Sequence, residues 1–158
     1  MKSNRELSCQ VLYQVCYKHQ HIKPALNQTL PAEISPQDRA WIQNTCYQTL
    51  RHYQNMRARW QQFVPKAIKD QMVDLLLTMS VTQKFIMDAP DHATVNEAVR
   101  TCKKLGKKCR EILGERAKNM SDEQVLLFRF QQALLDMLIE KTRYMKKAQY
   151  RKDIGTTP

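Results

Sequence analysis

Glycine is scarce in this chain, and that scarcity restricts the possible folds more than any other feature. The 158 residues include only three glycines and six prolines. Hairpin turns depend on glycine, whereas helix interiors exclude both residue types, so the composition favours helices. No stretch alternates polar and apolar residues with a period of two, and we therefore expect no sheet. The sequence predicts an all-α protein, and its length is that of one domain.

The same glycines exclude the common phosphate-binding loops. Gly106, Gly114 and Gly155 lie far apart, so neither a G-x-G-x-x-G turn nor a P-loop can form. The glycine-rich turn that binds a nucleotide or a methyl donor in Rossmann-type folds is missing as well. We therefore expect no cofactor.

Apolar side chains recur every three or four residues along most of the chain, as they do on the buried face of a helix. Ser35 is expected to cap one helix, with Pro36 at the tolerated first position. Asp91 is expected to cap another helix, directly after Pro90. Residues 81–87 either continue the preceding helix or form a short one. The expected helices span about 4–19, 22–30, 35–53, 56–64, 66–79, 91–105 and 121–147.

The five cysteines indicate reduced thiols, because their number is odd and no C-x-x-C pair occurs. Several fall at or beside apolar helical positions, where a free cysteine acts as a small hydrophobic residue. Trp60 also matches the apolar stripe of its helix. In the helix from residue 91, Val95, Val99 and Cys102 recur at helical spacing on one face. We therefore expect a core that includes Cys9, Cys16, Trp60, Val95, Ala98, Val99 and Cys102.

The chain is strongly basic, with a formal net charge of +11 and a pI of about 9.6. Such a charge attracts polyanions, and RNA or DNA is the usual partner. Fourteen of the 26 lysines and arginines follow residue 100, against seven of the 15 acidic residues. A solvated basic surface without a specific ligand is the alternative.

Other site types are less well supported by the sequence. Cys16, His19 and His21 have metal-ligand chemistry, but nothing nearby supplies a convincing fourth ligand, so we expect no metal. His92 stands alone at a helix start, where a local hydrogen bond is the expected role. No signal peptide is visible, and the longest apolar cluster, at residues 75–77, is too short to span a bilayer.

The segment Ala93-x-Val95-Asn96-Glu97-Ala98-Val99, followed by Lys103-Lys104-Leu105-Gly106, resembles the signature of the NusB family. Domains of this family are all-helical. They serve as transcription antitermination factors and as the N-terminal domain of a ribosomal RNA 5-methylcytosine methyltransferase. Further segments resemble the family in the same order, and two of them favour the methyltransferase-type branch. These segments are Arg5-x6-Leu12-x2-Val15, Asp38-Arg39 with Tyr47-x2-Leu50-Arg51, and Met79-Ser80-x2-Gln83 before Asp91-His92-Ala93.

Two departures from the family pattern stand out. Family members carry several arginines at the N-terminus, whereas this chain has only Lys2 and Arg5 there. The Asn-x-x-Leu-Arg-like sequence that usually follows the Lys-Leu-Gly turn is missing after Gly106. The likeness therefore covers about residues 5–106 and leaves the last third of the chain apart.

The resemblance implies a single-domain, NusB-like antiparallel helical bundle in the bacterial cytoplasm. Residues 1–106 would form the core, 107–150 a basic helical extension of the same domain, and 151–158 a frayed tail. Asn96 and Glu97 would fix neighbouring backbone and helix packing. The implied function is non-catalytic binding of ribosomal RNA or of a nascent transcript.

Arginine and lysine side chains are the candidates for RNA contact, because they bind phosphate. Three of the arginines are interleaved with Tyr53 and Trp60, and aromatic rings can stack on unpaired bases. The run of lysines around residue 105 is the densest cluster. The candidate RNA-binding residues are Lys2, Arg5, Arg51, Arg57, Arg59, Lys103, Lys104, Lys107, Lys108 and Arg110.

Two other functions remain open. The chain is alternatively a protein-interaction adaptor, because NusB relatives pair with a small-subunit ribosomal protein or with a second copy of themselves. It is alternatively an accessory fragment of a ribosomal RNA methyltransferase that docks the substrate for an enzyme in trans.

We predict that the purified chain transfers no methyl group by itself. It lacks a glycine-rich methyl-donor site, and no Pro-Cys nucleophile motif occurs in it. The measurement is incorporation of labelled methyl groups from a methyl donor into ribosomal RNA. Incorporation above the level of a boiled-protein control would contradict the prediction.

Overall fold

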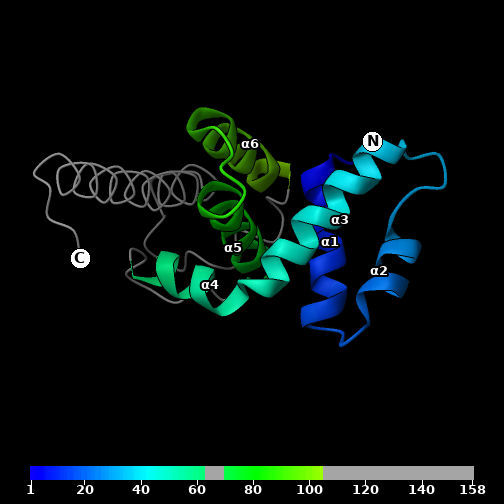
Figure 1. Ribbon diagram of the computed structural model, residues 1–158, viewed down its shortest axis with the longest axis horizontal. Helices are drawn as coiled ribbons and strands as arrows, with labels where there is room; N and C mark the ends of the chain where they lie inside the picture. The colour runs from blue at the N-terminus through cyan, green and yellow to red at the C-terminus, as the bar shows by residue number, and fades with distance from the viewer. Residues whose placement is uncertain (63–69, 105–158) are drawn as a thin grey trace, which may run out of the picture.

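The computed structural model describes residues 1–62 and 70–104, and these residues form six helices and no strand (Figure 1). This confirms the all-α class. The expected helix 121–147, the extension from residue 107 and the tail lie outside the described residues. The helices are α1 (Asn4–Cys16), α2 (Ile22–Thr29), α3 (Pro36–Arg51), α4 (Tyr53–Gln61), α5 (Gln71–Phe85) and α6 (Asp91–Lys104).

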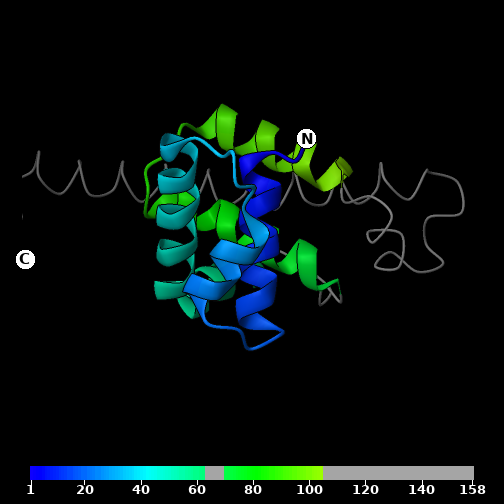
Figure 2. The ribbon, with the colours of Figure 1, turned by 90° about the vertical axis from the view of Figure 1, so that its right-hand side faces the viewer.

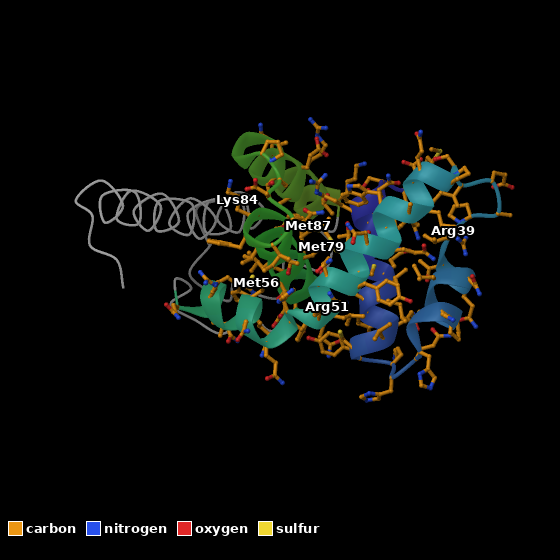
Figure 3. The ribbon with its side chains drawn as sticks, viewed as in Figure 1. Arg39, Arg51, Met56, Met79, Lys84 and Met87 are labelled. Carbon is orange, nitrogen blue, oxygen red and sulfur yellow. The ribbon has the colours of Figure 1, made fainter. Side chains whose placement is uncertain are left out.

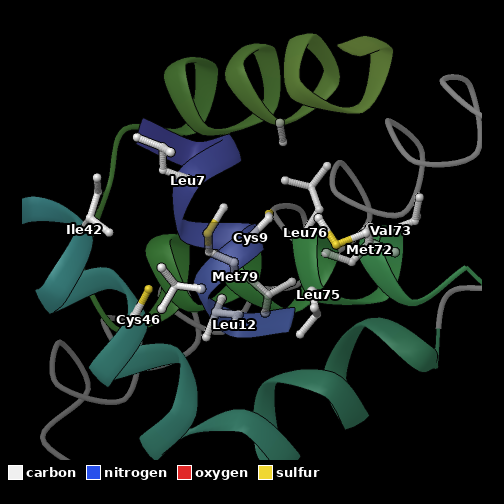
Figure 4. Close-up of a cluster of buried hydrophobic side chains, with 14 of the residues drawn as sticks. Leu7, Cys9, Leu12, Ile42, Cys46, Met72, Val73, Leu75, Leu76 and Met79 are labelled. Atoms are coloured by element: carbon white, nitrogen blue, oxygen red, sulfur yellow. The ribbon is translucent and has the colours of Figure 1, made fainter. Parts of the chain in front are cut away.

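Helices α1, α3 and α5 contact one another and form the centre of the bundle. Helix α2 packs on α1, and α4 packs on α5. Helix α6 lies across the start of α1 and along α5, so it closes one end of the bundle (Figure 2). Figure 4 shows the result, a core in which side chains of α1, α3 and α5 meet beneath α6.

Helix α5 is buried on every side. All residues from Met72 to Gln83 are buried, including the polar ones. A helix that is buried all round must be surrounded by other elements, and here α1, α3, α4 and α6 pack against it. Its core partners include Leu7, Val11 and Leu12 of α1, Ile42 and Cys46 of α3, Met56 and Trp60 of α4, and Ala98 and Cys102 of α6.

Side-chain caps set several helix starts. The Ser35 hydroxyl accepts from the amide of Asp38 at 3.1 Å, as predicted, with Pro36 in the first turn. Ser3 forms a capping box with Glu6. The predicted start of α5 at residue 66 is wrong: Asp70 has extended backbone, and its carboxylate accepts from the amides of the next turn. Helix α5 then runs on to Phe85, so the segment from residue 81 continues it.

Two other helix boundaries differ from expectation. Helix α1 ends at Cys16 instead of near residue 19, because His19 has φ of 56° and so lies in the left-handed region that ends a helix. The expected single helix 35–53 stops at Arg51, and His52 separates it from α4. Local periodicity is the same on both sides of such a break and does not reveal it.

The helix from residue 91 buries the face that its apolar spacing predicted. Ala98 is fully buried and Cys102 is 1 % exposed. The side chains of Asp91, Val95 and Val99 lie outside the described part of the helix. Helix α6 packs on α5, and the small side chains of Ala98 and Cys102 belong to the shared core.

We predict that Ala98→Asp destabilises the domain by about 3 kcal/mol or more, because it places an unpaired charge in the core. Typical domains have a margin of roughly 5–15 kcal/mol, so the loss should lower the melting temperature clearly. Circular dichroism melts measure it. Asn96→Asp is the matched control, because Asn96 is exposed on the same helix. Equal melting temperatures for the two variants would show that α6 does not pack through this face.

Candidate nucleic-acid interface

The structure separates the candidate RNA-binding residues into exposed and internally paired side chains. Lys2, Arg51 and Arg59 are exposed. Arg51 ends α3 where α4 begins (Figure 3). The guanidinium of Arg59 lies over the ring of Phe85, with its carbon 4.8 Å from the ring centroid. These three side chains are accessible to a phosphate group.

Arg57 is held by a carboxylate of the buried helix. Its Nε donates to Asp74 Oδ1 at 3.0 Å, and its Nη2 donates to Oδ2 at 2.8 Å. The Asp74 side chain is only 4 % exposed, while that of Arg57 is 40 % exposed. The hydrogen bonds to Asp74 raise the pKa of Arg57. This bidentate pair joins α4 to α5, and it occupies the fork of Arg57 that a phosphate would need.

Trp60 and Tyr53, which alternate with these arginines in the sequence, face inward. Trp60 is 1 % exposed, as predicted for a core residue, and its indole nitrogen donates to Thr78 Oγ1 at 2.9 Å. Tyr53 is half-buried, and burial raises the pKa of its hydroxyl. Trp60 therefore offers no ring face to a base, and the Tyr53 ring is only partly accessible.

Arg5 is mostly buried at the start of α1. Its guanidinium carbon lies 5.6 Å from the ring centroid of Trp41, and its Nη1 lies 3.9 Å from Glu97 Oε2. Burial lowers the pKa of Arg5, and the charge of Glu97 partly opposes this. Its Nε is buried and has no hydrogen-bond partner among the described residues. Arg5 therefore lies in a wall shared by α1, α3 and α6.

Lys104 is the one residue of the lysine-rich run whose side chain is described. Its Nζ lies 3.2 Å from Glu6 Oε1, and its side chain is 48 % exposed. Burial raises the pKa of Glu6, but the hydrogen bonds and charge from Lys104 and Ser3 outweigh this and lower it overall. The side chain of Lys103, and Lys107, Lys108 and Arg110 altogether, lie outside the described residues.

A pocket of about 650 Å³ opens where the ends of several helices meet. It lies between the start of α1, the first turns of α3, the end of α5 and the first half of α6. Met87, labelled in Figure 3, lies on the connection from α5 to α6 that forms one wall. The lining residues are Ser3, Asn4, Arg5, Gln37, Asp38, Trp41, Gln83, Met87, Ala89, Pro90, Ala93 and Glu97.

Gln83 is the lining residue that sequence reasoning missed as a site residue. It is 1 % exposed, and neither its Nε2 nor its Oε1 has a hydrogen-bond partner among the described residues. A buried polar group without a partner costs about 1–3 kcal/mol. Its place in the family-like segment Met79-Ser80-x2-Gln83 was the available signal. Trp41, which is half-buried beside Arg5, gave no signal in the sequence.

Histidines and cysteines form no comparable site. Within residues 1–62 and 70–104, no group of three His, Cys, Asp or Glu side chains could hold a metal. His19 and His21 are exposed, and the side chain of His92 is outside the described part. The buried Cys9 and half-buried Cys16 support the predicted core role. Burial raises the pKa of Cys16 to about 11, so its thiol stays protonated at neutral pH.

The fold and the pocket define the class of protein: an all-α bundle around one buried helix, with a pocket between helix ends. The chain belongs to the NusB family, whose model matches residues 2–113. The predicted family resemblance is therefore confirmed. No curated protein and no solved structure gives a significant match to the chain. In the part that the structure describes, no helix is both long enough and apolar enough to cross a bilayer.

We predict that Arg57→Met lowers the free energy of unfolding by about 1–3 kcal/mol. The loss leaves the buried Asp74 carboxylate without its partner, and it stays below the roughly 3–5 kcal/mol of a fully buried pair because Arg57 is partly exposed. Urea unfolding measures it. Arg59→Met removes the same charge from an exposed position and is the control.

The double variant Arg57→Met with Asp74→Leu should recover part of the loss, because no buried charge remains without a partner. If Arg57→Met unfolds at the same urea concentration as Arg59→Met, the pair contributes nothing to the fold. Arg57 would then return to the set of residues available to RNA.

Proposed function

We propose that this chain is a non-catalytic RNA-binding protein of the NusB type that acts in the cytoplasm. Membership of the NusB family over residues 2–113 is the observation that carries the proposal. The net charge of +11 supports it, because a polyanionic partner would neutralise this charge. Ribosomal RNA, or a nascent transcript with ribosomal leader sequence, is the class of RNA that the family resemblance favours.

Two groups of basic residues are the proposed phosphate contacts. The exposed Lys2, Arg51 and Arg59 form the first group. The lysine-rich run of residues 103–110 forms the second, and the family match extends through it. Arg5, Arg57 and Lys104 contribute less, because each already lies against a carboxylate of the bundle. We also propose that residues 107–150 extend the domain as a basic helical segment.

We predict that the protein binds single-stranded ribosomal RNA fragments with a steep salt dependence. Each neutralised phosphate adds about 0.7 to the slope of log K against log salt concentration. Fluorescence anisotropy at several salt concentrations measures this slope. Reversing two proposed contacts, Lys107→Glu with Lys108→Glu, should lower the slope by about 1.4.

The charge-matched control is Lys18→Glu with Lys23→Glu, which reverses two exposed lysines outside the proposed contacts. It should reduce affinity less than the reversal at residues 107 and 108. Equal effects of the two reversals would mean that the basic run is only a solvated face. Binding that does not respond to salt, or no binding at low salt, would leave the adaptor function as the better description.

A further inference from the structure

We propose that Arg59 and Phe85 together form a stacking platform for one unpaired base of single-stranded RNA, with the guanidinium between the base and the ring. This inference rests on the proposed RNA-binding function, and it adds a base contact to the phosphate contact assigned to Arg59. The guanidinium carbon lies over the Phe85 ring, 4.8 Å from the ring centroid. Bases of single-stranded RNA stack on guanidinium planes as well as on aromatic rings.

The fold fixes the ring that lies beneath Arg59. Phe85 is the last residue of α5, and its side chain is half-buried against the hydrophobic core. Arg59 lies near the end of α4, which packs on α5, and it is exposed. A ligand can therefore reach the guanidinium from the side away from the ring. Because Phe85 orients the guanidinium before a ligand arrives, less side-chain freedom is lost on binding.

Among the arginines that the structure describes, Arg59 alone combines exposure with an aromatic ring beneath it. Arg5 lies over Trp41, but it is mostly buried. Arg51 is exposed, but it lies over no ring among the described residues. The remaining three donate to side chains of the bundle: Arg39, Arg57 and Arg100.

Single-stranded RNA is the partner that matches this pair of side chains. A phosphate alone needs only the positive charge, and a lysine would supply that as well. The flat, delocalised guanidinium also offers a face to a base, while the N–H groups at its edge can donate to a neighbouring phosphate. Ile86, directly after Phe85 in the chain, is 38 % exposed, so the end of α5 also presents apolar surface.

The test compares two labelled strands: ten-nucleotide oligo-adenylate, and an abasic strand with the same number of phosphates. The wild-type protein should bind oligo-adenylate more tightly. Arg59→Lys keeps the charge but removes the plane, so the ratio of the two affinities should fall about five-fold or more. Binding of the abasic strand should change much less, because it depends on charge. Arg100→Lys, at an exposed arginine outside the proposed contacts, is the matched control and should keep the ratio.

Two variants of Phe85 separate its role in positioning Arg59 from a role in folding. Phe85→Leu removes the ring and should lower the affinity ratio about two- to five-fold. Phe85→Tyr keeps the ring and should keep the ratio. Thermal melts show whether each variant folds. If Phe85→Leu fails to fold, Arg59→Lys decides the matter, because Arg59 is exposed and its replacement leaves the core intact.

The outcomes distinguish this inference from the proposed function. Equal affinity for the two strands, with a steep salt dependence, would overturn the stacking platform and leave phosphate binding in place. An affinity ratio that is unchanged in Arg59→Lys, or that falls equally in Arg100→Lys, would also overturn it. The same holds if Phe85→Tyr lowers the ratio as much as Phe85→Leu does. Binding of neither strand would remove the proposed function, and the inference with it.

Discussion

The complete burial of α5 is the constraint on which the rest of the bundle depends. A helix with no solvent-facing side needs neighbours all round, and its polar side chains need partners inside the protein. The carboxylate of Asp74 finds one in Arg57, and Thr78 accepts from the indole of Trp60. Two side chains of α4, Arg57 and Trp60, are therefore held against α5 by hydrogen bonds as well as by packing. Gln83 lines the pocket, and among the described residues its two buried polar atoms have no hydrogen-bond partner.

Local signals in the sequence were sufficient for most of the fold. Spacing of apolar residues located the helices, and Ser35 with Pro36 located the start of α3. The same method failed at the start of α5, because a helix buried on all sides has no periodic pattern to mark its first turn. In the structure, the carboxylate of Asp70 caps α5 and marks its start. In the sequence, nothing in the apolar spacing distinguishes Asp70 from a surface aspartate.

The candidate site was harder to predict, for a physical reason. Arg57 looked like a phosphate ligand because its partner, Asp74, is far along the chain and belongs to another helix. The pocket joins residues from four helices, so no local pattern contains it. Net charge, by contrast, is a sum over residues and can be counted directly from the sequence. Residues 63–69 and 105–158 hold 14 of the 26 basic residues but only seven of the 15 acidic ones. Charge predicts a kind of partner, and only the fold shows where a specific group would fit.

Helix α2 differs from the other helices in how it is attached. It packs on α1, and Arg39 of α3 adds a hydrogen bond to Asn27. No part of α2 contributes to the polar network of α5. Its detachment would expose little more than Ala25 and Leu26 and the surface beneath them. We therefore expect the backbone amides of α2 to exchange with solvent through local openings, and those of α5 to exchange only when the whole bundle unfolds. Helix α2 contributes no residue to the pocket, so it can fluctuate without loosening the pocket.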